Sequence, residues 1–236
     1  MRALAEGAPQ GRTVELPGVS AAVMPAAPER SVINCVVYED AGRLAESLDT
    51  LAHEYDSAGV RAWTVWVPDG DPGASEALAR AGHLNDGNPR AMVLDLESFE
   101  GEPDPSLVLA ERPSLREVGR LNDLAYGLSG DFERALDGVP TEGFHVYLGL
   151  LGGEPAGSVI TYDCERDCGV YLVATAPSAQ GRGLATALMI RAMAEGRDRG
   201  CATSSLQATK RGRPVYERLG FEDLGAIAMW ERRQTS

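Results

Sequence analysis

Residues 173–186 read VATAPSAQGRGLAT, and this stretch is the most informative part of the sequence for the fold. Val173 and Thr175 are typical of a strand, and Pro177 stops it because proline cannot continue the hydrogen-bond ladder. A glycine turn follows, and apolar residues at helical spacing begin at Leu184. A helix that starts after such a turn presents unpaired backbone amides, which together with the helix dipole attract an anion.

The spacing of the glycines narrows the choice of anion. A P-loop needs a lysine after its second glycine, and the turn contains none. A dinucleotide-binding turn needs Gly-x-Gly-x-x-Gly. Gly181 and Gly183 fit this pattern, but Thr186 stands where the third glycine should be. The remaining pattern is Gln/Arg-x-x-Gly-x-Gly/Ala, which Gln180, Gly183 and Ala185 satisfy. Here the chain resembles the GCN5-related N-acetyltransferase (GNAT) superfamily, whose pyrophosphate loop has this pattern.

A second stretch extends the resemblance. Residues 212–221 read GRPVYERLGF, which is similar to the late helix of the family, where a tyrosine precedes a Gly-Phe pair. The resemblance implies an α/β (α+β) fold with a mixed central sheet flanked by helices. The expected strands span residues 107–110, 145–151, 156–163, 169–175, 202–208 and 225–231, and the expected helices span 115–126, 132–136, 183–196 and 214–219.

The resemblance also implies a cofactor and its contacts. Acetyl-CoA would bind as co-substrate, its pantetheine arm pairing with the backbone of Val173, Ala174 and Thr175. The pyrophosphate would be held by the turn and the first residues of the helix: Gly181, Arg182, Gly183, Leu184, Ala185 and Thr186. In the family an asparagine often stands seven residues before the late tyrosine. Here Thr209 takes that place, so a side-chain contact to the cofactor is expected from a threonine instead.

The catalytic residues follow in part from the same comparison. Tyr216 matches the family tyrosine proposed to protonate the departing CoA thiolate, and a phenol can donate that proton. The attacking amine must lose a proton, and the family has no fixed position for the base that takes it. Asp163, Glu165 and Tyr171 lie on or beside the central strands and are the candidates.

The resemblance therefore implies an acetyl-CoA-dependent N-acetyltransferase that acts on a primary amine of a small molecule or a protein. Two alternatives stay open at this point. A non-catalytic acyl-CoA-binding sensor or regulatory module would keep the loop and lose turnover. A protein that serves only as an interaction partner would bind no CoA.

Composition sets limits on partners and compartment. The net charge of −13 and the lack of a basic stripe disfavour nucleic acid. Cys164 and Cys168 have no second ligand pair at zinc spacing, so no metal is expected. The sequence has neither the long apolar run of a membrane span nor the h-region of a signal peptide. We expect a soluble, cytoplasmic protein without a membrane partner.

The first part of the chain repeats the order of the last part. Residues 34–96 read as strand, helix, strand, short helix, strand, as do residues 169–232. Tyr38-Glu39-Asp40 stands where the glycine turn should be, and two carboxylates would repel a pyrophosphate. We predict a flexible segment over 1–30 with one short strand near 14–16, a degenerate GNAT-like half-domain over 31–103, and the catalytic domain over 104–236. The half-domain would extend the sheet, shape the acceptor cleft or make a homodimer contact.

Overall fold

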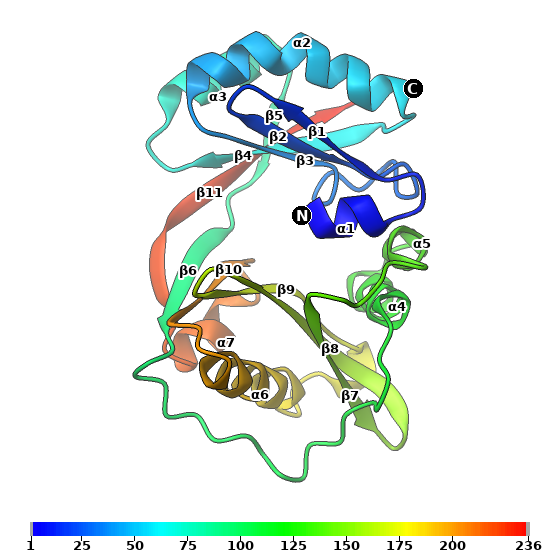
Figure 1. Cartoon of the computed structure of the whole chain (residues 1–236), viewed down its shortest axis with the longest axis vertical. Helices are drawn as coiled ribbons and strands as arrows, with labels where there is room; N and C mark the ends of the chain where they lie inside the picture. The colour runs from blue at the N-terminus through cyan, green and yellow to red at the C-terminus, as the bar shows by residue number, and fades with distance from the viewer. Residues whose placement is uncertain (1, 235–236) are drawn as a thin grey trace. The chain divides into compact units, whose positions relative to one another are not determined.

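The computed structural model describes residues 2–234 and divides into two compact units (Figure 1). Unit 1 comprises the residues up to 89, residues 134–139 and the chain from 225 onward, whereas unit 2 comprises residues 90–133 and 140–224. Within residues 2–234 no helix is both long and apolar enough to cross a membrane.

Unit 1 contains a mixed sheet. Strands β1 (Arg12–Leu16), β2 (Val19–Val23) and β3 (Cys35–Tyr38) are antiparallel neighbours, and β3 pairs in parallel with β4 (Ala62–Pro68). Strand β11 (Glu222–Arg233) runs antiparallel to β4, and β5 (Leu84–Gly87) pairs with β11. The helices are α1 (Arg2–Gly7), α2 (Ala41–Ser57) and α3 (Pro72–Arg80).

The core of unit 1 lies between the sheet and helices α2 and α3. Leu44, Leu48 and Leu51 recur at helical spacing along α2, and all three are buried against the strands. Tyr55 of the same helix stacks on Trp63 of β4 with ring centroids 4.7 Å apart. The apolar stripe of α2 therefore holds this helix on the sheet.

The first thirty residues differ from the sequence-based expectation. Beyond Met1, which lies outside the described residues, the segment forms α1, β1 and β2 instead of a mobile tail with one short strand. Val19, Ala21 and Val23 alternate toward the core, and this pattern is short enough to be missed in an Ala- and Gly-rich segment. The strand predicted near residues 14–16 is confirmed as part of β1, but the flexibility predicted for the rest of the segment is wrong, because β2 pairs with β3 and so joins the hairpin to the sheet.

Unit 2 contains the second sheet. Its strands lie in the order β6 (Arg90–Asp95), β10 (Thr203–Ala208), β9 (Asp167–Thr175), β8 (Glu154–Cys164) and β7 (Phe144–Leu151). Only β9 and β10 are parallel; the other neighbours in this order are antiparallel. The helices are α4 (Leu115–Tyr126), α5 (Asp131–Leu136, of which the last three residues fall in unit 1), α6 (Leu184–Asp198) and α7 (Arg213–Arg218).

Helices α4 and α6 cover opposite faces of this sheet. Successive residues of a strand point to opposite faces, and in β8 Gly157 meets α6 whereas Ser158 contacts α4. A Cβ on Gly157 would lie 2.9 Å from side-chain carbons of both Leu184 and Leu188, so a larger residue would force these two leucines to shift. The predicted apolar face of α6 is confirmed for Leu184, Leu188 and Ala192, which are buried.

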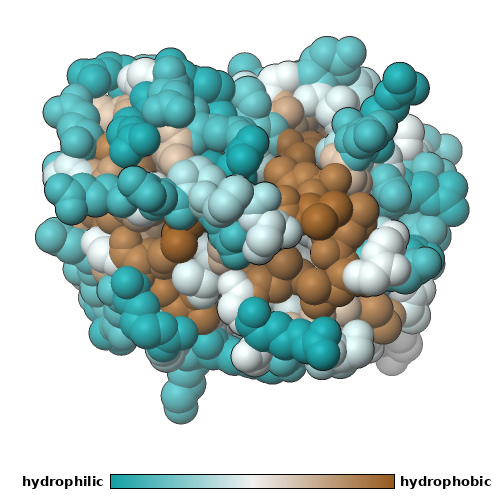
Figure 2. All heavy atoms as spheres, turned by 90° about the horizontal axis from the view of Figure 1, so that it is seen from below, coloured by the Kyte–Doolittle hydropathy of each residue, from teal (hydrophilic) through white to brown (hydrophobic). Residues whose placement is uncertain are grey.

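The outer side of α6 is not uniformly polar. Ala185, Ala187 and Ile190 are half-buried on this helix. Seen from below the view of Figure 1, the molecule shows apolar areas between polar ones (Figure 2). Apolar and polar residues are therefore less clearly separated on two faces in α6 than they are in α2.

The fold class predicted from the sequence is confirmed: mixed sheets are flanked by helices. The strand expected over residues 107–110 is reduced to one isolated bridge between Leu109 and Gly149. Residue 103, where the sequence suggests a boundary, lies inside unit 2. That unit 1 is a degenerate copy of unit 2 stays a prediction.

Each sheet contains a strand that follows the other unit in the chain. Strand β6 comes directly after the first 89 residues, yet it pairs with β10 in unit 2. Residues 227–233 of β11 come after unit 2, yet they pair with β4 in unit 1. Neither unit therefore completes its sheet from one continuous stretch of chain.

Candidate active site

Strands β9 and β10 of unit 2 separate part of the way along their length. Their parallel pairing comprises Thr203 with Asp167, Ser204 with Cys168, and Ser205 with Gly169. Among the described residues the two strands pair no further, so the facing edges of β9 from Val170 onward and of β10 from Leu206 onward are not bonded to each other. Such edges can pair with an extended polar ligand that enters between them.

A β-bulge in β9 bends this strand at the opening. The register with β8 shifts between Ser158 and Ile160, opposite residues 171–174, and Leu172 has a left-handed backbone with φ 51°. This conformation is costly for a branched side chain and is found where surrounding contacts enforce it. The bulge therefore has to be held by its neighbours.

Two buried side chains hold the bulge through the carbonyl oxygen of Leu172. The Ser158 hydroxyl donates to this oxygen at 3.0 Å, and the Asn122 amide donates to it at 3.3 Å. Asn122 also donates to the Val118 carbonyl one turn earlier in α4, at 2.9 Å. The bulge is thus tied to both its neighbouring strand and α4.

The turn after β9 leads into α6 through two left-handed glycines. Gly181 has φ 76° and Gly183 has φ 77°, and apart from its neighbours in the chain no described residue comes within 4 Å of a Cβ built on either glycine. No side chain caps the first turn of α6, so its free amides remain available to a ligand. Arg182 between the glycines is exposed. The start of α6 therefore offers free backbone amides, and the binding of an anion there stays a prediction.

Gln180 links the two sides of the opening. Its amide nitrogen lies 3.4 Å from the Thr175 carbonyl, and its amide oxygen accepts a hydrogen bond from Arg211 at 2.5 Å. Arg211 belongs to the loop after β10, whereas Gln180 belongs to the turn after β9. A guanidinium is therefore placed at the end of the opening where the helix amides lie.

Tyr216 lies on α7, which follows β10. The residue is 8% exposed, and its ring packs edge-on against Phe221, with ring centroids 5.9 Å apart. Its hydroxyl makes no hydrogen bond with the residues that the structure describes. Burial, and to a smaller extent the nearby phenol of Tyr126, raise the pKa of Tyr216 well above its ordinary value. Tyr216 therefore keeps its proton at neutral pH.

Tyr126 is a site residue that the sequence analysis missed. It ends α4, and its hydroxyl lies 3.4 Å from the Val173 carbonyl of β9. Although 56% of the residue is exposed, partial burial of its hydroxyl raises the pKa of Tyr126. An exposed tyrosine at the end of a helix carries no sequence signal of its role; only its closeness to β9 and Tyr216 identifies it.

Thr209 lies between β10 and α7. Its hydroxyl oxygen accepts the Gly212 N–H at 3.1 Å, and its carbonyl accepts the Arg213 N–H at 2.9 Å. In this structure the threonine holds the turn that starts α7 and so helps to position Tyr216. Its predicted contact to the cofactor stays a prediction.

Two of the predicted base candidates lie far from the end of β9. Asp163 and Glu165 are at the hairpin between β8 and β9, and Asp163 is six positions along β8 from Gly157, which pairs with Thr175. At about 3.3 Å per residue this is roughly 20 Å from the end of β9. Tyr171 precedes the bulge, but its hydroxyl lies back toward Gly169. Burial raises the pKa of Tyr171.

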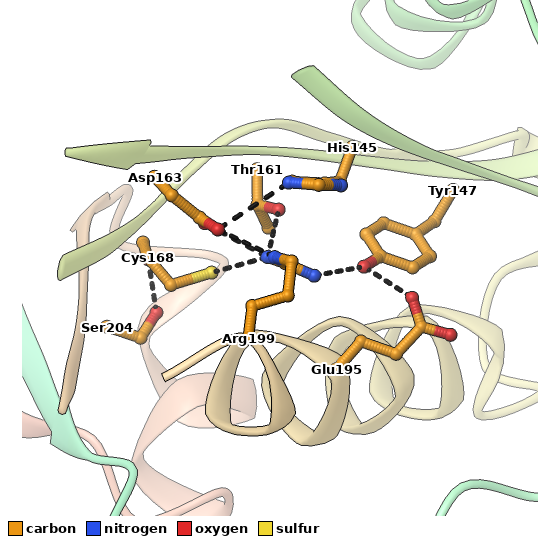
Figure 3. A network of polar contacts seen from close by, with 8 residues as sticks. All are labelled: His145, Tyr147, Thr161, Asp163, Cys168, Glu195, Arg199 and Ser204. Atoms are coloured by element: carbon orange, nitrogen blue, oxygen red, sulfur yellow. Dashed lines mark hydrogen bonds and ion pairs between the residues drawn. The ribbon is translucent and has the colours of Figure 1, made fainter. Parts of the chain in front are cut away.

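Asp163 is engaged in an ion pair with Arg199 of α6. The Arg199 Nε and Nη2 atoms lie 2.6 and 2.9 Å from the two carboxylate oxygens (Figure 3). These hydrogen bonds hold the pKa of Asp163 below its ordinary value, which makes it a weaker base. The sequence could not reveal this pair because 36 residues separate the partners.

The rest of this network ties α6 to the sheet. Arg199 also lies 3.4 Å from the hydroxyl of Tyr147, which donates to Glu195 at 2.8 Å, and His145 lies 3.5 Å from Asp163 (Figure 3). Across residues 2–234 no three His, Cys, Asp or Glu side chains gather in a group able to hold a metal ion. The arrangement is that of a structural contact at the end of α6 away from the glycine turn.

Comparisons with known proteins agree with this geometry. Residues 110–221 match the family model "Acetyltransferase (GNAT) family". A GCN5-related N-acetyltransferase from Kribbella flavida is 15% identical, with a TM-score of 0.69 over 99% of this chain and 92% of that one. One from Sphaerobacter thermophilus is 17% identical, with a TM-score of 0.61 over 92% and 76%.

A tandem GNAT protein from the clavulanic acid biosynthesis pathway has a TM-score of 0.59 at 15% identity, over 92% of this chain and 79% of that one. At such identities the structures show a shared fold alone. A search of curated proteins found no match. The family model, together with the separated strands and the glycine turn, identifies residues 110–221 as an acyltransferase domain of the GNAT superfamily.

Proposed function

We propose that unit 2 binds acetyl-CoA in the opening between β9 and β10 and transfers the acetyl group to a primary amine. One observation carries the proposal: the start of α6, which has left-handed Gly181 and Gly183 and no side-chain cap among the described residues, follows a strand that separates from its parallel neighbour β10. Backbone amides there suit the pyrophosphate, and the edge of β9 suits the amides of the pantetheine arm.

The chemistry assigned to the chain is simple. A neutral amine nitrogen attacks the thioester carbonyl, the tetrahedral intermediate collapses, and the C–S bond breaks to release the thiolate of CoA. Tyr216 would donate its phenolic proton to this thiolate, since a phenol is protonated at neutral pH before the step. We assign the deprotonation of the amine to water in preference to Asp163, whose carboxylate is bound to Arg199.

The proposed cofactor site is tested by a thermal-shift titration of the full chain with acetyl-CoA. At a concentration 100 times the dissociation constant, binding stabilises the folded state by about 2.7 kcal/mol. For a chain of this size the melting temperature then rises by roughly 5–10 °C. No rise at millimolar acetyl-CoA would contradict the proposal.

Two matched variants make the test specific. Gly183→Glu adds a carboxylate where the phosphates would bind, so the rise should disappear. Gly59→Glu makes the same change at another left-handed glycine, φ 70°, which follows α2 in unit 1 and has open space around it. This control should keep the rise, because the strain is the same but the position lies outside the proposed site.

Turnover is measured separately, as release of the CoA thiol in the presence of a panel of primary amines. Thiol release that depends on an amine supports the transferase. A thermal shift without thiol release for any amine would favour an acyl-CoA sensor.

A further inference from the structure

Unit 1 contains a cavity of about 370 Å³ at the carboxyl end of β4. It is lined by the end of this strand, the first turn of α3, the β5 segment and one face of β11. The volume lies within the range typical of small-molecule sites, near its lower end. The acetyl transfer proposed above makes no use of this cavity.

The charged side chains that line the cavity are acidic. Asp69 and Asp71 are the only charged residues among the described residues that line the cavity. The Asp71 carboxylate is fixed, because it accepts the Ala74 N–H at 3.0 Å and the Tyr38 hydroxyl at 2.8 Å. The Asp69 carboxylate makes no such contact with the described residues and is exposed. A cavity walled by two carboxylates and no cation attracts positive charge.

The floor of the cavity is apolar. Ala226, Ala228 and Trp230 alternate along β11 and therefore share one face, and Val67 of β4 is buried beside them. Near the rim the side-chain amides of Asn85 and Asn88 bond each other, at 3.1 and 3.2 Å. An acidic rim above an apolar floor suits a ligand with a cationic head and an apolar body.

A metal ion fits this lining less well than an organic cation. Calcium takes six to eight oxygen ligands, and magnesium prefers a full octahedron. Only two carboxylates line the cavity, and one of them already accepts two hydrogen bonds from the protein.

We propose that this cavity binds a small organic cation, a primary amine or guanidinium on an apolar chain. The charged head lies between Asp69 and Asp71, and the chain lies on Ala228 and Trp230. The acceptor of the proposed acetyl transfer belongs to the same chemical class, so the experiment must separate the two sites.

The test uses the tryptophan fluorescence of the full chain without acetyl-CoA. All three tryptophans, Trp63, Trp66 and Trp230, belong to unit 1, so the signal reports on the unit that holds the cavity. The probes are n-hexylamine and agmatine, with 1-hexanol as the neutral counterpart of the first. We expect a saturable change with both amines and about fivefold weaker binding of the alcohol, as for one partly exposed charge contact. Failure of both amines, or equal binding of the alcohol, overturns the proposal.

A pair of variants locates the binding. Asp69→Asn should weaken hexylamine binding about fivefold, because it removes one charge from the rim. Asp86→Asn is the matched control: this carboxylate is exposed on β5 but does not line the cavity, and its loss should leave binding unchanged. Equal binding by wild type and Asp69→Asn would place the amine elsewhere and overturn the proposal.

Two further variants separate this site from unit 2. Ala228→Leu should fill the floor and abolish the fluorescence change; if this variant fails to fold, the pair at Asp69 and Asp86 decides. Gly183→Glu should bind hexylamine as the wild type does, because its change lies in the cofactor loop. Loss of hexylamine binding in Gly183→Glu would mean that the amine binds in unit 2. Acetyl-CoA titrations of Asp69→Asn keep the two proposals distinguishable, since they report on the cofactor site alone.

Discussion

The two units begin their central helices in different ways. In both, a parallel strand pair is joined through a helix: β3, α2 and β4 in unit 1, and β9, α6 and β10 in unit 2. The parallel pairing is short in both units, with two residue pairs between β3 and β4 and three between β9 and β10. The strand-helix-strand order is therefore shared, and the difference between the units lies in the turn before each helix.

Before α2 the cap is a carboxylate. Asp40 has an extended backbone and accepts the Arg43 N–H at 3.0 Å, so the helix start already holds an anionic group from the protein. Before α6 the cap is Gly183, left-handed and without a side chain. A helix N-terminus attracts an anion in either case, but in unit 1 the chain supplies it, and in unit 2 the position is free for a ligand.

The most direct test of this difference is to give α6 the aspartate N-cap of α2. In Gly183→Asp we expect acetyl-CoA to bind at least about a hundredfold more weakly, because charge-assisted hydrogen bonds of about 1.5–3 kcal/mol each are lost and a carboxylate repels the phosphates. Aspartate tolerates a left-handed backbone, so the fold should persist. Calorimetric titration with acetyl-CoA measures the loss, and unchanged affinity would show that the start of α6 does not hold the cofactor.

The next difference is the helix after the second parallel strand. Helix α7 carries Tyr216, whereas α3 of unit 1, with the sequence PGASEALAR, has no tyrosine. We expect Tyr216→Phe to lower kcat about a hundredfold, a typical contribution of a general acid, with the KM for acetyl-CoA nearly unchanged. Tyr147→Phe is the control, since Tyr147 belongs to the structural network at the far end of α6. Steady-state thiol release decides, and normal turnover in Tyr216→Phe would remove the acid role.

The units should also differ in their response to acid. His83 is buried in unit 1 against Trp63, and burial, with a smaller effect of Arg232, lowers its pKa from 6.5 to about 4. Between these values the unfolded chain binds a proton that the folded chain does not, so stability falls as pH falls. From pH 7 to pH 5 the expected loss is about 2 kcal/mol.

Urea unfolding followed by tryptophan fluorescence measures this loss, since all three tryptophans lie in unit 1. His83→Phe should show a smaller dependence on pH, whereas His53→Gln, at an exposed position of α2, should keep the wild-type dependence. In unit 2 the lowered pKa of Asp163 gives stability that is present above about pH 4 and lost below it. Identical behaviour of the wild type and His83→Phe would show that His83 does not cause the acid sensitivity.

The smallest expected effect is at the cap of α2 itself. Asp40→Ala removes the side-chain bond to Arg43 and should cost about 1 kcal/mol of stability. It should leave acetyl-CoA binding unchanged, because the proposed site is in unit 2. Urea unfolding and calorimetric titration of the same preparation check both statements, and a gain of cofactor binding on removing this carboxylate would mean that unit 1 retains a hidden cofactor site.

From the sequence alone we could predict the features that depend on residues close together in the chain. The glycine turn before α6, the apolar face of that helix and the order of elements from α4 to β11 all follow from local spacing and turn chemistry. Tyr216 was identified instead through the resemblance of residues 212–221 to the late helix of the family, in which a tyrosine precedes a Gly-Phe pair.

The contacts that join distant parts of the chain are visible only in the tertiary structure. The bulge at Leu172 is held by Asn122, 50 residues away, and Asp163 is occupied by Arg199, 36 residues away. The pairing of β11 with β4 and the acidic cavity beside it bring residues 67–88 and 226–230 together. Strand pairing and side-chain contacts over such separations leave no local pattern, because each partner alone looks like an ordinary polar or strand residue.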